Sequence, residues 1–164
     1  MKKIGLISDT HSYLDHQVFD FFKNVDEIWH AGDFGNPAVS EQLSEFKPLR
    51  GVYGNIDGRE IRTQHPLDNR FNCEGLDVWM THIGGYPKRY DKRVWQILQN
   101  NPPGLFICGH SHIVKVMRDP DYDMLVFNPG AAGKVGWQKE RTVLRFSIET
   151  SKVKDMELIK LGKR

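Results

Sequence analysis

Short apolar runs alternate with amphipathic segments over the first third of the chain. Residues 3–8, 27–31 and 49–53 are brief hydrophobic runs, which are typical of buried strands. Between them, residues 15–24 and 37–46 carry apolar side chains at helical spacing. The first of these segments begins with an Asp that can cap a helix, and the second begins with a Pro. The order strand–helix–strand–helix–strand predicts a parallel sheet with helical crossovers.

The pattern changes in the second part of the chain. Residues 69–74 and 76–81 flank a Glu-Gly turn and predict a hairpin, while residues 90–99 form an amphipathic helical pattern before a double-proline stop. Residues 105–108 are another buried apolar run. In four later segments, apolar and polar residues alternate, as they do in half-buried antiparallel strands. These segments are residues 113–117, 124–128, 142–148 and 152–159. We expect an α/β fold with two mixed sheets packed face to face, helices outside them, and one domain over residues 1–164.

Composition and charge narrow the class of protein. A chain of 164 residues with 39% hydrophobic and 27% charged residues is ordinary for a globular protein that buries a substantial core. A net charge of +2 is too small to indicate a nucleic-acid partner. Cys73 and Cys108 lie in separate strand-like runs, so we expect free thiols. The first apolar run is too short for a signal-peptide core, and no segment is long enough to span a bilayer. We therefore expect a cytoplasmic protein with no membrane partner.

Seven residues that make good metal ligands follow segments with the pattern of a strand. They are Asp9, His11, Asp33, Asn55, His82, His110 and His112. In open α/β sheets, functional sites form at the carboxyl ends of strands, so these side chains can converge on one edge. Carboxylate, imidazole and amide ligands together suit two divalent transition metals. Two metals held close together are a common device for attacking phosphate esters.

Each motif alone has an ordinary structural explanation. Asp9 and Asp33 each follow a strand in a sequence typical of turns, and Asn55 follows a glycine as many turn residues do. The sharpest motif is the pair His110 and His112, because two histidines that flank a serine after a buried strand are hard to explain by packing. Five such signals at strand ends together favour a metal site.

Three further histidines are assigned other positions. We expect His30 to be a buried residue behind the ligands, and His16 and His65 to lie at the surface, with a functional role for His65 left open.

Taken in order, these motifs resemble the signature of the calcineurin-like metallophosphoesterases, in particular their small single-domain bacterial and archaeal phosphodiesterases. The resemblance extends to the Asn-Pro-Gly turn at residues 128–130. It implies a four-layer α/β/β/α sandwich with two divalent metal ions. Manganese is the first expectation, with zinc, iron or nickel as alternatives.

The resemblance also implies roles for individual residues. One metal would take Asp9, His11, Asp33 and His112, and the other would take Asp33, Asn55, His82 and His110. Asp33 would bridge the two metals together with a water or hydroxide, which attacks phosphorus in line. Asp33, Asn55 and His110 would be the catalytic residues, and the substrate would be a small phosphodiester or a nucleotide.

The chain departs from the family pattern at two positions. Ile56 stands where many larger members carry a His that can protonate the leaving group, so that proton must come from elsewhere or the leaving group must be a good one. Ile83 stands where the family usually has Gly, although two glycines follow directly. Asp57 remains beside Ile56 and is a candidate for a supporting role. Lys88 and Arg89 are candidates for phosphate contacts, but a solvated surface is the more ordinary explanation for them.

Other functions remain as alternatives. A non-catalytic scaffold exists on the same fold in a eukaryotic endosomal coat, but the complete ligand set argues against that role here. The small net charge argues against a nuclease, and Ile56 favours diesters over monoesters. The sequence leaves both a monomer and a homo-oligomer open.

Overall fold

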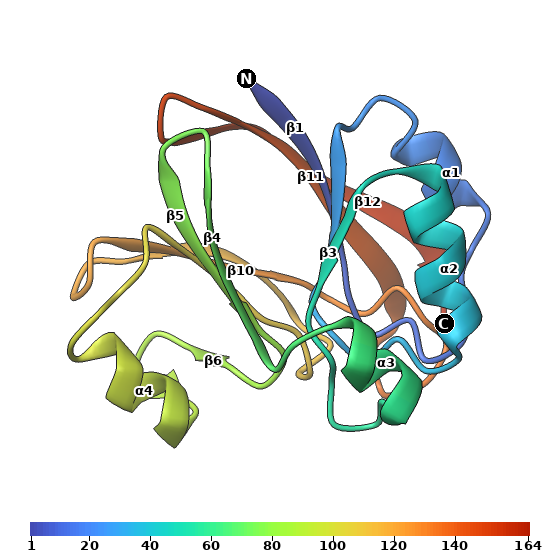
Figure 1. The fold of residues 1–164 in the computed structure, drawn as a ribbon, viewed down its shortest axis with the longest axis horizontal. Coiled ribbons are helices and arrows are strands. Elements are labelled where there is room, and N and C mark those ends of the chain that lie inside the picture. Colours follow the sequence, from blue (N-terminus) through green and yellow to red (C-terminus); the bar gives the residue numbers. More distant parts are fainter.

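Two five-stranded mixed sheets pack face to face between layers of helices (Figure 1). This computed structural model describes residues 1–164. The first sheet has the order β12 (Lys152–Lys163), β11 (Glu140–Glu149), β1 (Lys2–Ile7), β2 (Glu27–His30) and β3 (Leu49–Gly51). The second has the order β4 (Asp68–Cys73), β5 (Leu76–Thr81), β8 (Leu105–Ile107), β10 (Met124–Pro129) and β9 (Val114–Asp119). The helices are α1 (Gln17–Phe21), α2 (Pro37–Phe46), α3 (Arg59–Gln64) and α4 (Lys92–Leu98).

Both sheets combine parallel and antiparallel pairs. Strands β1, β2 and β3 are parallel neighbours, as the β-α-β-α-β pattern predicts, and β11 and β12 extend this sheet in antiparallel fashion. In the second sheet β5, β8 and β10 are parallel, with β4 and β9 antiparallel at the edges. The carboxyl ends of β1, β2, β3, β5 and β8 therefore point toward one end of the molecule.

Three apolar cores correspond to the spaces between the layers. The core between the sheets includes Ile4, Trp29 and Phe146 from the first sheet and Met80 and Ile107 from the second. A second core lies under α1, α2 and α3, on the outer face of the first sheet, and a third lies under α4 on the outer face of the second. Figure 1 shows α1 and α2 on one side of the sheets and α4 on the other. The predicted four-layer α/β/β/α arrangement is confirmed.

Several element boundaries differ from the prediction for identifiable reasons. The helix predicted over residues 15–24 is only five residues long, because Phe22 leaves helical geometry and is fully buried. The helix predicted over residues 90–99 begins at Lys92, because the Asp91 side chain caps it and Tyr90 pairs with Gly85 instead. That pairing joins β6 (Gly85–Tyr86) to β7 (Arg89–Tyr90), a short hairpin that the apolar pattern did not reveal. The six-residue α3 was also missed.

The prediction for His65 was wrong. Its side chain is buried, its ring stacks on Phe34 with centroids 4.6 Å apart, and its Nε2 lies 2.8 Å from the Ser40 hydroxyl. His16 is exposed as predicted, and Cys73 and Cys108 are free, buried thiols as predicted. None of the helices has the length and apolar character needed to cross a membrane.

A buried ion pair joins the segment before α1 to the end of the first sheet. The Arg141 guanidinium donates to the Asp15 carboxylate at 2.7 Å, and both side chains are at least 90% buried. Asp15 also accepts a hydrogen bond from the Gln17 backbone N–H at 2.9 Å, at the start of α1. Burial alone would raise the pKa of Asp15, but the Gln17 amide and Arg141 hold that pKa below its ordinary value of 3.8.

We expect Asp15→Asn to lower the free energy of unfolding by roughly 3 kcal/mol near neutral pH, because it leaves Arg141 buried without its partner. Since the folded-state pKa of Asp15 is lowered, this contribution is complete above about pH 4 and is lost as the pH falls through the lowered value. Urea unfolding at pH 7 and at steps below pH 4 measures both effects. Asp20→Asn, at an exposed position in α1, is the matched control, and an equal effect of the two substitutions would contradict the prediction.

Candidate metal centre

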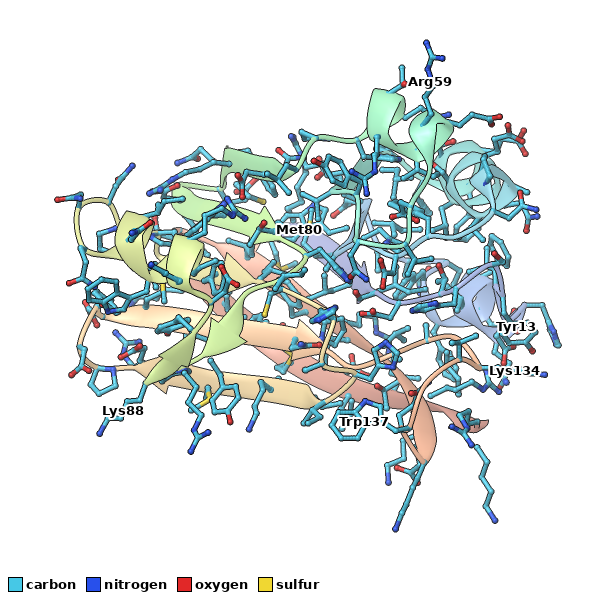
Figure 2. All side chains as sticks on the ribbon, turned by 90° about the horizontal axis from the view of Figure 1, so that it is seen from below. Tyr13, Arg59, Met80, Lys88, Lys134 and Trp137 are labelled. Carbon is cyan, nitrogen blue, oxygen red and sulfur yellow. The ribbon has the colours of Figure 1, made fainter.

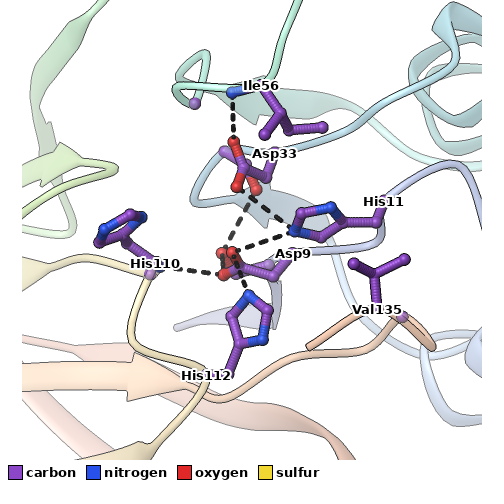
Figure 3. A network of polar contacts seen from close by, with 12 residues as sticks. Asp9, His11, Asp33, Ile56, His110, His112 and Val135 are labelled. Carbon is purple, nitrogen blue, oxygen red and sulfur yellow. Dashed lines mark hydrogen bonds and ion pairs between the residues drawn. The ribbon is translucent and has the colours of Figure 1, made fainter. Parts of the chain in front are cut away.

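Six of the seven candidate ligands gather in two groups at the carboxyl ends of the strands. Asp9, His11 and His112 form one group, and Asp33, His82 and His110 form the other; within each group the candidate donor atoms lie within 4.8 Å of one another. These residues follow β1, β2, β5 and β8, so both sheets contribute (Figure 3).

The Asp33 carboxylate lies between the two groups. Its Oδ2 is 3.3 Å from His11 Nε2 in the first group and 3.1 Å from His82 Nε2 in its own group. Its Oδ1 accepts a hydrogen bond from the Ile56 backbone N–H at 3.1 Å (Figure 3). Gly54 is required beside it, because a Cβ there would lie 2.0 Å from Asp33 Oδ1. One carboxylate therefore contacts both groups and the loop after β3.

Two imidazole nitrogens show that the site fits a cation. Nε2 of His11 and Nε2 of His82 are buried and have no hydrogen-bond partner, although carboxylate oxygens lie nearby. Buried polar atoms are nearly always hydrogen-bonded, so this arrangement needs an explanation. A metal ion that accepts a lone pair from each nitrogen and neutralises the carboxylates supplies one.

The electrostatics of the two groups are dominated by their buried carboxylates. Burial alone would raise the pKa values of Asp9 and Asp33, but the surrounding histidines hold both well below the ordinary range. In turn, Asp33 and Asp9 raise the pKa of His11 to about 9. The site is thus built to keep negative charge where water is excluded, which makes it attractive to divalent cations.

Two of the histidines are held so that Nε2 points into the site. His82 Nδ1 lies 2.7 Å from the Ala31 carbonyl oxygen, to which its N–H donates, and this contact crosses from one sheet to the other. His112 Nδ1 lies 2.8 Å from Gln138 Oε1, and the Gln138 amide donates to the carbonyl oxygens of Gly133 and Val135. Such partners fix the tautomer of a metal-binding histidine. No pattern in the sequence indicates this role of Gln138.

Asp9 and Asp57 are held by hydrogen bonds to the surrounding loops. Asp9 Oδ2 accepts from the Ser8 hydroxyl at 2.6 Å and from the His110 backbone N–H at 3.1 Å. The Asp57 carboxylate accepts from three backbone N–H groups, those of Phe34, Gly35 and Gly54. Asp57 therefore connects the loops after β2 and β3, which carry two of the candidate ligands.

His30 and Asn128 support the site from behind. His30 is fully buried; it accepts from the Gly32 N–H at 3.1 Å, and its Nε2 lies 3.1 Å from the Thr10 hydroxyl. Burial lowers the pKa of His30 to about 3, so the ring is neutral. The Asn128 side chain donates to the Gly109 carbonyl at 2.9 Å and so holds the loop that carries both late histidines.

The backbone is unusual at five of the candidate ligands. Asp9, His11, Asp33, His110 and His112 all have positive φ, between 44° and 70°. Residues with side chains rarely adopt this left-handed conformation, which costs roughly 1 kcal/mol each. Such outliers cluster at functional sites, where the surrounding structure enforces them.

The remaining candidates lie outside the two groups. Asn55 is exposed on the loop after β3, where it lines a pocket together with His82. Lys88 lines a different pocket with Tyr90 and Trp95, and Arg89 is exposed on β7. Figure 2 shows Lys88 at the opposite side of the molecule from Tyr13. Neither basic side chain is part of the ligand cluster.

An α/β sandwich with carboxylates and imidazoles gathered at its strand ends defines a class of metal-binding protein. Residues 1–151 match the model of the calcineurin-like phosphoesterase superfamily domain. The chain belongs to this superfamily and is a metal-dependent phosphoric ester hydrolase.

Archaeal relatives agree with this assignment, and solved structures agree with the fold. The chain is 31% identical over 164 residues to a probable metallophosphoesterase of Methanothermobacter thermautotrophicus, covering 97% of this chain and 92% of the relative. It is 29% identical to a phosphodiesterase of Methanocaldococcus jannaschii, covering 78% and 82%. The fold matches the structure of an archaeal phosphodiesterase with a TM-score of 0.77 at 23% identity, covering 97% and 99%. It also matches Chaetomium thermophilum Vps29 with a TM-score of 0.76 at 14% identity, covering 99% and 98%.

We expect Gln138→Leu to weaken metal binding by roughly 10- to 100-fold, because His112 loses the partner that orients its ring. Competition with a fluorescent chelator for Mn²⁺ or Zn²⁺ measures the affinity. Gln42→Leu, at an exposed position in α2, is the matched control. Equal affinities of the Gln138 variant and the unmodified protein would show that this contact does not support metal binding.

Proposed function

We propose that this protein is a metal-dependent phosphodiesterase that hydrolyses small phosphodiesters or nucleotides. The observation that carries the proposal is the position of Asp33 Oδ2, within 3.3 Å of His11 Nε2 and 3.1 Å of His82 Nε2. A carboxylate oxygen between two groups of donors suits a pair of divalent cations. The name of the Methanocaldococcus jannaschii relative, a phosphodiesterase, supports the choice of diesters.

In this proposal each metal has four protein ligands. One would be held by Asp9, His11, Asp33 and His112, and the other by Asp33, Asn55, His82 and His110. Divalent metals would supply Lewis-acid stabilisation of charge on the phosphate oxygens and would lower the pKa of the attacking water. Manganese is our first choice because the donors are hard oxygens and imidazoles, with zinc, iron and nickel as alternatives.

The protein side chains have separable tasks in this reaction. Asp33 sets the relative position of the two donor groups, and Asp9 holds the first group from a fully buried position. Asn55 and His110 are the exposed members of the set, so an incoming phosphate group meets them first. We therefore assign catalytic roles to Asp33, Asn55 and His110.

Ile56 restricts the choice of substrate. Its backbone N–H donates to Asp33, while its side chain is 47% exposed at the rim and has no proton to give. Without a general acid at this position, hydrolysis favours esters whose alcohol leaves without strong assistance. This supports diesters with good leaving groups over monoesters of ordinary alcohols.

The alternative is a non-catalytic scaffold on the same fold. The likeness to Vps29 structures, at about 15% identity, concerns the fold alone. Even so, Vps29 of Entamoeba histolytica has been solved as a zinc complex, so the fold is compatible with metal. A scaffold has no need of two buried carboxylates with two unpartnered imidazole nitrogens, and for that reason we favour the enzyme.

We further propose that residues 1–164 act as one metallophosphoesterase domain. We place it in the cytoplasm, where its two free thiols remain reduced.

Asp33→Asn tests the central assignment. We expect the variant to stay folded but to lose metal-dependent hydrolysis of bis-p-nitrophenyl phosphate by at least about a hundredfold, since metal ions contribute several kcal/mol and each 1.4 kcal/mol is a factor of ten. The assay compares this diester with p-nitrophenyl phosphate after chelation and after return of Mn²⁺.

Asp121→Asn, at an exposed position remote from the cluster, is the matched control, and circular dichroism checks the fold. Undiminished turnover by the Asp33 variant would refute the bridging role. Absence of turnover in the unmodified, metal-loaded protein would favour the scaffold, or a narrow substrate that neither ester imitates.

Ile56→His tests the missing general acid. An imidazole at this rim position can protonate a leaving oxygen, so we expect hydrolysis of diesters with poor leaving groups to rise at least about tenfold relative to nitrophenyl esters. Ile56→Ala is the control, because it shows the effect on hydrolysis of removing the isoleucine side chain without adding an imidazole. Identical substrate profiles for the two variants would mean that position 56 does not face the leaving oxygen.

A further inference from the structure

A small pocket opens directly from the second donor group. It has a volume of about 260 Å³, and two of its lining residues, His82 and Asn55, belong to the candidate metal centre. Its volume is below the roughly 300–1,000 Å³ typical of sites for drug-sized ligands. The pocket therefore suits one substituent of a ligand and not a whole molecule.

The walls of this pocket are largely apolar. Tyr53, Leu67 and Ile83 line it, and the side chains of Leu67 and Ile83 are 43% and 39% exposed. Exposed apolar side chains that gather beside a polar site commonly mark a binding surface. A ring-sized group that binds between these side chains would bury its apolar surface away from water.

The guanidinium at this pocket is already paired within the protein. Arg93 donates to the Asp68 carboxylate at 2.8 Å and to the Thr81 hydroxyl at 2.7 Å. The Asp91 carboxylate, which also lines the pocket, accepts from the Arg93 backbone N–H at 3.0 Å. A negatively charged substituent would therefore lose its water here without gaining a free cation and would lie near a carboxylate, so an uncharged substituent is favoured over an anionic one.

A larger groove lies on the other side of the centre, beside His112. It has a volume of about 670 Å³, and three of its eight lining residues are charged: Lys139, Glu140 and Lys163. Apolar side chains are exposed on that side too, among them Ile113 in the groove and Val135, which Figure 3 shows next to His11 and His112. The two sides of the candidate metal centre therefore differ in size, and the smaller pocket matches a single ring-sized substituent.

We propose that the pocket formed by Tyr53, Leu67 and Ile83 binds one uncharged, ring-sized organic substituent of the phosphodiester and so selects aryl or heteroaryl diesters. The inference rests on the proposed function in taking the ligand to be a phosphodiester. Leu67 and Ile83 are specificity residues in this assignment, and the phosphate lies against the exposed donors Asn55 and His110.

The test separates binding from hydrolysis. Zinc-loaded protein, which is diamagnetic, is labelled at Leu and Ile methyl groups and titrated with diphenyl phosphate and with dimethyl phosphate. We expect diphenyl phosphate to bind at least about tenfold more tightly, with shifts of the Leu67 and Ile83 methyl signals. Leu67→Ala and Ile83→Ala should each reduce this ratio, whereas Leu158→Ala, at an exposed position on β12, should leave it unchanged.

Three outcomes would overturn the assignment: equal affinity for the two diesters, no binding of either, or methyl shifts at Ile113 beside His112 in place of Leu67 and Ile83. The methyl signals of the unmodified protein show which side binds the ring, even if a variant is unstable. Turnover of bis-p-nitrophenyl phosphate is measured in parallel. Turnover without ring preference would refute the pocket and leave the phosphodiesterase standing. Ring preference without turnover of this diester would support the pocket and count against the proposed phosphodiesterase activity.

Discussion

The structure depends on keeping two carboxylates in a place from which water is excluded. Asp9 is fully buried and Asp33 nearly so, at the end of the molecule where both sheets direct their strand ends. Charge in such a position must be balanced by nearby cations or by hydrogen bonds to the charged form. Backbone amides supply part of that balance, through His110 for Asp9 and Ile56 for Asp33. The imidazoles, and the metals that they fit, complete it.

The rigidity of the centre comes from residues that reach between loops. Asp57 connects the loops after β2 and β3 through three amides, and Asn128 holds the loop after β8. The His82 ring contacts the Ala31 carbonyl across the space between the sheets. Neither sheet alone would hold the donors in place, because each donor group draws residues from strands of both sheets. The geometry of the site therefore depends on how the two sheets pack against each other.

Most of the fold, and the residues that gather at the strand ends, could be predicted from the sequence. Apolar runs identify the central strands because buried parallel strands admit few polar residues. The short hairpin of β6 and β7 escaped prediction because two-residue strands have no periodicity to detect. His65 looked like a surface residue because its burial depends on stacking against Phe34. Gln138 could not be found, since a single hydrogen bond to His112 leaves no pattern in the sequence.

The left-handed backbone at five candidate ligands has a consequence for engineering. At positions such as Asp9, His11 and Asp33, glycine would adopt the observed φ without steric cost. Substitutions chosen for backbone conformation alone would therefore remove donors of the centre, together with the hydrogen bonds that Asp9 and Asp33 accept from the His110 and Ile56 amides. Backbone conformation and metal binding thus make opposite demands on the residues at this edge of the sandwich.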